Sequence, residues 1–151
     1  MQQVKIWFEL TIDKDGYPPF STESVWARTI SVGRYQIDNI PFYARSAAFG
    51  DVVSADNVDG CLWFRMIETA SSNSLVRVFM KSGRDALLDA LEKFDVRFEI
   101  ASERLMALSV PQKTLRPVRT ILRELHAQKI LDFEEPIIRT NSGAAPRKPR
   151  T

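Results

Sequence analysis

The sequence predicts an α+β protein in which a small antiparallel β-barrel-like part precedes a ferredoxin-like βαββαβ part. Two observations lead to this fold class. Short segments of alternating apolar and polar residues, separated by turn residues, fill about the first 70 positions. A strand–helix–strand pattern then occurs twice in succession. The expected parts are 1–72, barrel-like; 73–139, ferredoxin-like; and 140–151, a disordered basic tail.

Five strands are expected in the first part, at residues 4–12, 23–30, 34–37, 52–55 and 61–69. In the first of these, Ile6 and Phe8 alternate with polar residues, and Trp7 lies on the polar side, which is the pattern of a half-buried strand. In the fifth, Leu62, Phe64 and Met66 are expected to share one side. Five short strands with turn signals between them favour a small, partly closed barrel.

A pivot segment, residues 40–53, joins the two patterns. Pro41 restricts its own φ and favours extended backbone before it. Gly50 is expected to adopt a positive φ at the turn that enters the next strand. Two interpretations stay open: the segment is a crossover of the barrel, or Tyr43 and Arg45 face a ligand.

The second part is expected to contain strands at 75–80, 96–100, 105–110 and 131–138 and two helices. Ser82 with Asp85 predicts the start of the first helix, and Thr114 is expected to cap the second, with Pro117 in its first turn. Pro136 cannot donate to a sheet ladder, so the last strand is predicted to lie at an edge. The order is that of a split βαβ arrangement.

The composition limits the classes of protein to which this chain can belong. The chain has 151 residues, of which 44% are hydrophobic, and no apolar run approaches the roughly 20 residues of a membrane span. The N-terminus lacks the features of a signal peptide, and Cys61 is the single cysteine, so a cytoplasmic protein is expected. The net charge is 21 − 19 = +2, but residues 140–151 hold three cations and no acid, which leaves 18 − 19 = −1 elsewhere.

The inventory of reactive side chains is sparse. His126 is the single histidine, and one His with one Cys does not form a structural zinc site. No phosphate-binding glycine motif or H-E-x-x-H motif occurs. We therefore expect no catalytic residues, metal or cofactor, although a spatial dyad of Cys61 with His126 stays open.

Two groups of residues are candidates for partner binding. Arg116, Arg119 and Arg123 recur at helical spacing, rotated by about 100° from the expected core stripe, so they should face solvent. They form either a solvated face or a basic strip for phosphates or an acidic protein. The aromatic group either packs between the two parts or anchors a protein interface; its members are Trp7, Tyr17, Trp26, Tyr43 and Trp63. The selected partner-binding residues are Arg116, Arg119, Arg123, Tyr43, Arg45, Trp7 and Trp63.

Several short segments together carry a family resemblance. They are residues 15–19 (DGYPP), 26–27 (WA), 39–42 (NIPF), 50–53 (GDVV) and 76–78 (VRV). In these segments the chain resembles a bacterial family of unknown function, and the likeness extends more weakly to the end of the second helix. The resemblance implies a shared fold and a bacterial source, and it carries no catalytic residues over.

The expected function is that of a non-catalytic binding protein whose partner is another protein, such as an immunity protein, an inhibitor or an adaptor. One alternative is RNA or DNA binding through the basic helix stripe and the tail. The expected sheet faces offer that alternative few aromatic residues, with Arg77 on one strand and Arg97 and Glu99 on another. The other alternative is an enzyme with an unrecognised site.

Overall fold

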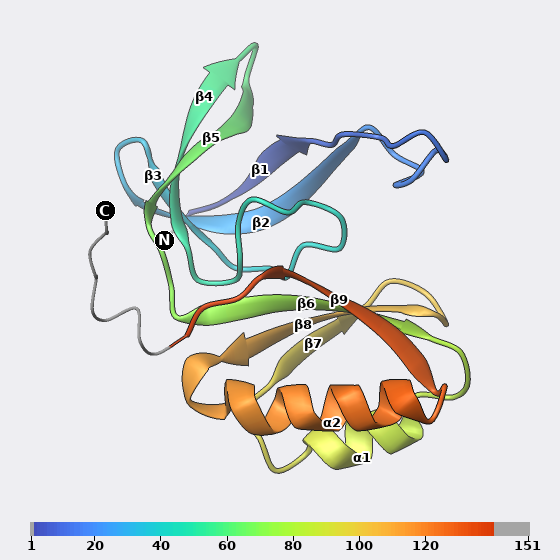
Figure 1. Ribbon diagram of the computed structural model, residues 1–151. Coiled ribbons are helices and arrows are strands. Elements are labelled where there is room, and N and C mark those ends of the chain that lie inside the picture. The colour runs from blue at the N-terminus through green and yellow to red at the C-terminus, as the bar shows by residue number, and fades with distance from the viewer. Residues whose placement is uncertain (1, 141–151) are drawn as a thin grey trace, which may run out of the picture. The chain divides into compact units, whose positions relative to one another are not determined.

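The computed structural model describes residues 2–140. It is a strand-dominated α+β structure with two sheets and two helices, and it divides into two compact units between Ser71 and Ser72 (Figure 1). Thr140 is exposed, and the rest of the predicted tail lies outside the described residues.

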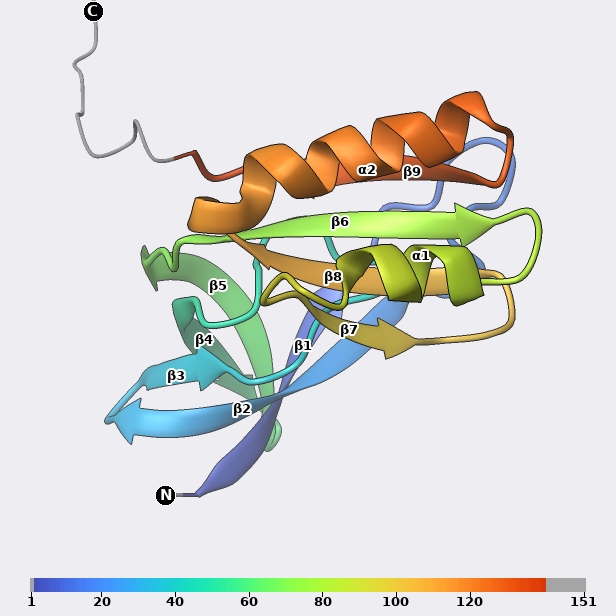
Figure 2. The same cartoon turned by 90° about the horizontal axis from the view of Figure 1, so that it is seen from below.

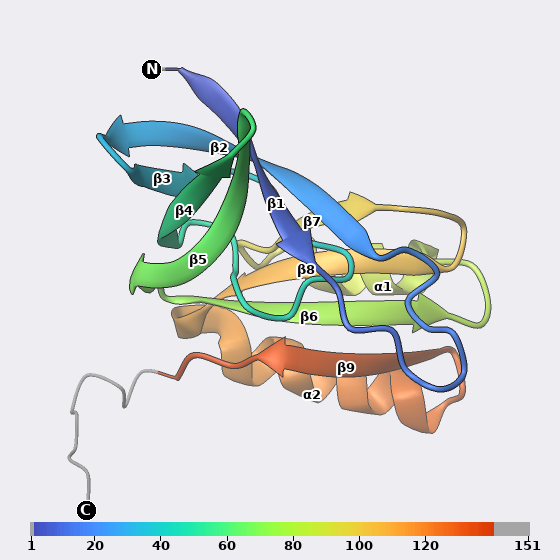
Figure 3. The ribbon, with the colours of Figure 1, turned by 90° about the horizontal axis from the view of Figure 1, so that it is seen from above.

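Unit 1 contains five strands. The sheet pairings run in sequence order and are antiparallel, and β1 also pairs in parallel with β5 at Ile6–Leu62 and Trp7–Trp63 (Figure 3). The bounds predicted for the third and fifth strands are confirmed, whereas the fourth continues three residues beyond its predicted end at position 55. The strands are β1 (Gln3–Glu9), β2 (Thr22–Ser31), β3 (Arg34–Ile37), β4 (Val52–Val58) and β5 (Cys61–Thr69).

The core of unit 1 follows the alternation of its strands. Phe8 of β1 stacks on Phe64 of β5 with ring centroids 4.8 Å apart. Ala44 and Ala47 of the pivot segment are buried in the same core, because small side chains let an irregular segment approach the strands closely. The fully enclosed members are Ile6, Phe8, Val25, Ala27, Ile37, Ala44, Ala47 and Val53.

Strand β5 contains an irregularity that the sequence pattern does not reveal. Between the Phe64 and Met66 pairs, the partner strand β4 advances by one residue, so Arg65 is an extra residue in β5. An extra residue reverses the side on which the following side chains lie. Met66 is therefore exposed, and Ile67 packs against the core. The prediction that Met66 shares a side with Leu62 and Phe64 is wrong.

Unit 2 contains one sheet with two helices on the same face (Figure 2). The strand order is β7-β8-β6-β9, and every pairing is antiparallel. A 3-10 turn at Gln112–Thr114 precedes the second helix. The elements are β6 (Asn73–Met80), α1 (Asp85–Leu91), β7 (Arg97–Ile100), β8 (Leu105–Pro111), α2 (Leu115–Ala127) and β9 (Leu131–Ile137).

The apolar faces of the helices agree with their sequence spacing. Leu87 and Leu91 of α1 are buried, as are Leu115, Val118 and Leu122 of α2, which confirms the predicted core stripes. These side chains meet one face of the sheet. Strands contribute the buried residues Val76, Val78, Met80, Met106, Leu108, Val110 and Leu131.

The predicted helix caps are wrong in detail. Helix α1 begins at Asp85 with Arg84 at the N-cap and no side-chain cap hydrogen bond, so Ser82 does not cap it. Thr114 does occupy the N-cap position of α2, but its hydroxyl donates to the carbonyl of Pro111 at 3.3 Å. The preceding 3-10 turn explains this, because it supplies a nearby carbonyl that competes for the hydroxyl.

The prediction of an edge position for the last strand is confirmed. Strand β9 lies at one end of the sheet, beside β6. Between the Leu75–Ile137 and Arg77–Glu134 pairs, β9 holds one residue more than β6, and Pro136 lies in this irregular stretch. A residue without an N–H group is tolerated at such a place because no ladder hydrogen bond is lost there.

We expect Gly50→Val to lower the free energy of unfolding by about 1–3 kcal/mol, because Gly50 has a φ of +88° that a β-branched residue rarely adopts. Ser46→Val is the control, since Ser46 is exposed on the same pivot segment and has no positive φ. Denaturant melts of both variants test the prediction. Equal stability of the two variants would contradict it.

Candidate functional site

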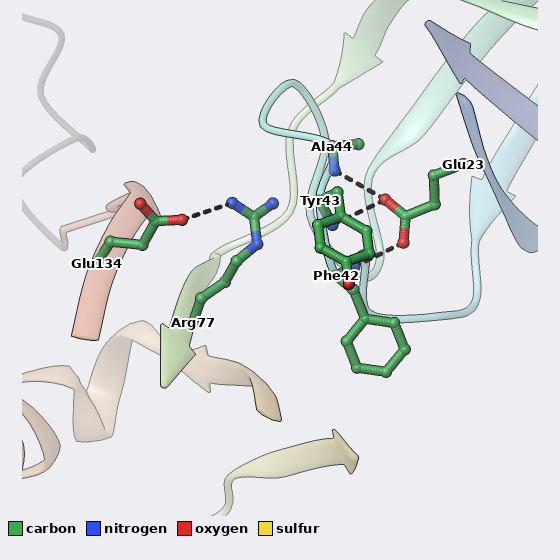
Figure 4. Close-up of polar contacts among 6 residues, drawn as sticks. All are labelled: Glu23, Phe42, Tyr43, Ala44, Arg77 and Glu134. Carbon is green, nitrogen blue, oxygen red and sulfur yellow. Dashed lines mark hydrogen bonds and ion pairs between the residues drawn. The ribbon is translucent and has the colours of Figure 1, made fainter. Parts of the chain in front are cut away.

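The carboxylate of Glu23 holds the start of the pivot segment. Glu23 lies on β2, and its two oxygens accept hydrogen bonds from three consecutive backbone N–H groups (Figure 4). The N···O distances are 2.7 Å from Phe42, 2.9 Å from Tyr43 and 2.7 Å from Ala44. Hydrogen bonds to an ionised acceptor are stronger than neutral ones, so this one side chain fixes the local path of the segment.

Two further side chains secure the neighbourhood of the same segment. The side-chain oxygen of Asn39 accepts the backbone N–H of Trp26 at 2.8 Å. Asp51, which is completely buried, accepts the backbone N–H groups of Ala48 and Ser71, each at 2.8 Å. A buried carboxylate requires such partners to offset the loss of water. These contacts assign Glu23, Asn39 and Asp51 to holding the backbone.

Tyr43 belongs to an aromatic cluster at the pivot segment. Its ring contacts Tyr17 at 6.0 Å and Phe20 at 5.7 Å between centroids, both edge-on, which is a favourable geometry for aromatic pairs. Tyr17 and Phe20 are exposed. Arg45 also has an exposed side chain, two residues further along. Of the two residues predicted for the pivot segment, Arg45 is therefore exposed, whereas Tyr43 is half-buried by its aromatic contacts.

All three tryptophans lie on the outer surface of adjacent strands in unit 1. Their neighbours along each strand point into the core, so Trp7, Trp26 and Trp63 point outward and form what we call the tryptophan face. The rings of Trp7 and Trp63 are 6.2 Å apart at an interplanar angle of 41°. Lys5 Nζ lies 5.0 Å from the ring centroid of Trp26, which is a cation–π distance, and Trp26 is 43% exposed.

The structure therefore brings two sequence-predicted residues, Trp7 and Trp63, into direct contact. Trp26 is a member of the aromatic group but is not among the residues that the sequence selects for partner binding. A signal for it existed, because Trp26 alternates with the apolar residues Val25 and Ala27 and so had to face outward. Lys5 was also missed, since only the pairing of β1 with β2 sets it against Trp26.

The arginine stripe on α2 consists of Arg116, Arg119 and Arg123, and these residues are of two kinds. Arg116 and Arg123 are exposed, as predicted. Arg119 instead forms a two-pronged ion pair with Glu135 of β9, with Nε to Oε2 at 2.8 Å and Nη2 to Oε1 at 2.9 Å. Its side chain is 29% exposed. The prediction that Arg119 faces solvent like its neighbours is wrong, because β9 brings a carboxylate alongside this side of α2.

The exposed arginines line an open hollow of about 580 Å³ on unit 2, which we call the basic hollow. Lys113 adds a third exposed cation, and none of the residues that line the hollow in the described part of the chain is an acid. The wall consists of Gln112, Lys113, Leu115, Arg116, Pro117, Arg119, Arg123 and Thr140.

Arg77, His126 and Lys81 of unit 2 have acidic partners. Arg77 on β6 is buried, with 2% of its side chain exposed, and its Nη1 lies 3.0 Å from Oε2 of Glu134 (Figure 4). His126 Nε2 lies 3.3 Å from Asp132, which also lies 3.5 Å from Lys81. His126 thus lies beside the carboxylate of Asp132 on β9, next to the ion pair of Asp132 with Lys81.

Within residues 2–140, no group of three or more His, Cys, Asp or Glu side chains could hold a metal ion. Among the helices of that same range, none is long and apolar enough to cross a membrane.

The geometry defines a class: a strand-dominated α+β protein of two units, with outward-pointing tryptophans on one unit and exposed cations on the other. A family model described as "Domain of unknown function (DUF4265)" matches residues 23–133, and the chain belongs to this family. The predicted membership of a family of unknown function is thereby confirmed.

A solved structure has a similar fold. It is the crystal structure of a hypothetical protein from Neisseria gonorrhoeae, with 20% sequence identity and a TM-score of 0.80. The match covers 93% of this chain and 99% of that chain, so the two proteins share a fold. A comparison with curated proteins gave no match.

We expect Glu23→Gln to lower the free energy of unfolding by about 1–3 kcal/mol, because the amide group replaces one of the two accepting oxygens and leaves a backbone N–H without its acceptor. Glu68→Gln is the matched control, since Glu68 is exposed on β5. Denaturant melts would measure both. Glu23→Gln as stable as the control would show that the segment is held by other contacts.

The two kinds of arginine on α2 should also differ in stability measurements. A double-mutant cycle of Arg119→Ala with Glu135→Ala should yield a coupling of about 0.5–1 kcal/mol, because the pair is two-pronged and half-buried. Arg119→Lys should lose most of that coupling, since an ammonium cannot form the fork. Arg116→Ala and Arg123→Ala should each change stability by less than about 0.5 kcal/mol. Equal changes in stability at all three positions would contradict the distinction between the paired Arg119 and the exposed Arg116 and Arg123.

Proposed function

We propose that this protein is a non-catalytic binding protein whose partner is another protein, and that the tryptophan face of unit 1 contacts that partner. Immunity proteins, inhibitors and adaptors work in this way. The observation that carries the proposal is the gathering of Trp7, Trp26 and Trp63 on the outside of three adjacent strands.

The physical support is the nature of tryptophan at interfaces. A tryptophan offers a large apolar area at a small cost in side-chain entropy, and its indole N–H can donate to a partner. Tryptophan is enriched among the residues whose truncation most weakens protein complexes. Large apolar side chains gathered on a soluble surface also mark interaction sites more often than scattered ones do.

The surroundings of the face suit a protein partner. Lys5 beside Trp26 supplies a cation at the border of the apolar area, and interfaces commonly combine an apolar centre with a polar rim. The two rings of Trp7 and Trp63 support one another, so little ordering is required when a partner binds. The non-catalytic part of the proposal rests on the sequence, which holds one histidine and one cysteine.

The proposal extends to the fold and the compartment. For unit 1 we infer a barrel-like arrangement, supported by pairings that run from β1 to β5 and return to β1. For unit 2 we infer a ferredoxin-like arrangement, supported by the order β7-β8-β6-β9 with a helix before β7 and another before β9.

A cytoplasmic location is supported by the free, exposed thiol of Cys61, which a reducing compartment keeps unmodified.

A site-specific cross-link followed by reconstitution tests the function. A photoreactive phenylalanine analogue at Ser24, which pairs with Trp7 across β1 and β2, should capture one protein in the source cells. The same analogue at Val32, which is fully exposed in the β2–β3 turn, is the control. The captured protein is then purified and its affinity measured with wild-type protein and with Trp26→Ala and Trp63→Ala.

We expect each tryptophan variant to weaken that affinity by about 10-fold or more, which corresponds to roughly 1.4 kcal/mol, while thermal melts remain close to wild type. Val32→Ala should bind as wild type does. Capture from both positions alike, or equal affinity of the tryptophan variants for the purified partner, would rule out the tryptophan face as the binding surface.

A further inference from the structure

The basic hollow on α2 carries a separate inference, which rests on the proposed function for the existence of a protein partner. Three cationic side chains that line the hollow are exposed to solvent: Lys113, Arg116 and Arg123. The charge of Arg119 in their midst is offset by the fork to Glu135. The hollow therefore offers three available positive charges, and its described lining contains no carboxylate that would oppose an incoming anion.

The spacing of these cations indicates an extended anion. Arg116 and Arg123 are seven residues apart on α2, so their backbone positions differ by about 10.5 Å along the helix axis. Arg119, which lies between them, is held by Glu135. A ligand that uses both free arginines must therefore carry negative charges separated by a comparable length.

The rest of the lining distinguishes a protein segment from a nucleic acid. Proteins that bind single strands stack the bases on aromatic side chains, and none of the residues between 2 and 140 that line this hollow is aromatic. Leu115 and Pro117 supply apolar contact instead. Outside residues 140–151 the chain has a net charge of 18 − 19 = −1, which gives little long-range attraction for a nucleic acid.

We propose that the basic hollow docks an acidic segment of the protein partner, with carboxylates spaced by about three residues in an extended chain. An extended chain of the polyproline II type has three residues per turn and advances roughly 3.1 Å per residue, so acids three residues apart lie on the same side and are separated by about 9 Å. Each exposed arginine then meets one carboxylate in a two-pronged geometry, and Lys113 meets a third as a point charge. The pairing of Arg119 with Glu135 keeps that carboxylate from competing for the other two arginines.

The test uses a fluorescent peptide with Glu at every third position and Leu and Ser between, measured by anisotropy at low ionic strength. The variant Lys113→Glu, Arg116→Glu, Arg123→Glu should weaken peptide binding by about 10-fold or more. The matched control reverses Lys14, Arg34 and Arg65, which are exposed on unit 1, and should change the affinity by less than about twofold.

Several outcomes would overturn the proposal. These are no measurable binding of the peptide up to about 1 mM, equal weakening by the hollow variant and the control variant, and peptide binding unchanged in the hollow variant. A single-stranded RNA with the same number of charges is measured in parallel. Tighter binding of RNA, lost in the hollow variant, would assign the hollow to nucleic acid instead.

The two proposals fail separately. Trp26→Ala leaves the basic hollow intact, so it should bind the acidic peptide as wild type does while losing affinity for the captured partner. If the peptide does not bind but the tryptophan variants weaken the partner complex, only the docking of the acidic segment is overturned. If the peptide binds as expected but the tryptophan variants do not weaken the complex, only the tryptophan face is overturned.

Discussion

The carboxylate of Glu23 is the interaction on which the shape of unit 1 depends. The segment between β3 and β4 runs from residue 38 to residue 51 without regular ladder partners, and its amides still require acceptors. Glu23 accepts three of them in succession, at Phe42, Tyr43 and Ala44. This places Ala44 in the core beside the strands and leaves the Tyr43 ring against Tyr17 and Phe20. One acidic side chain thus couples a strand, a loop and an aromatic cluster.

Charged residues in this protein fall into two structural groups. Glu23, Asp51 and the Arg119–Glu135 pair hold backbone or neighbouring elements through short hydrogen bonds. Arg116, with Arg123, remains exposed at the basic hollow. Partly buried pairs with good geometry contribute more to folding than exposed charges do. The exposed charges are consequently the ones free to serve recognition.

The two surfaces belong to different units and differ in chemistry. The tryptophan face of unit 1 carries three indole rings, two of them 6.2 Å apart, and is proposed as the centre of an interface. The basic hollow of unit 2 is polar and cationic, and it suits an acidic segment, where electrostatic attraction raises the rate of association. The fold shared with the Neisseria gonorrhoeae protein at 20% identity indicates a common scaffold and no function, so the proposed functions rest on the side chains of these two surfaces.

The sequence by itself determined which segments become strands and helices and which of their sides are apolar. The alternation around Ile6, and the helical spacing of Val118 and Leu122, depend only on residues adjacent along the chain, so such patterns are visible without a structure. Tertiary structure alone decided that Arg65 is an extra residue in β5 and that Arg119 is paired whereas Arg116 is not. It also decided the contacts of Glu23 with amides about 20 residues away. The physical reason is that hydrogen bonds between distant residues depend on where the strands meet in space, which the local period of apolar residues does not specify.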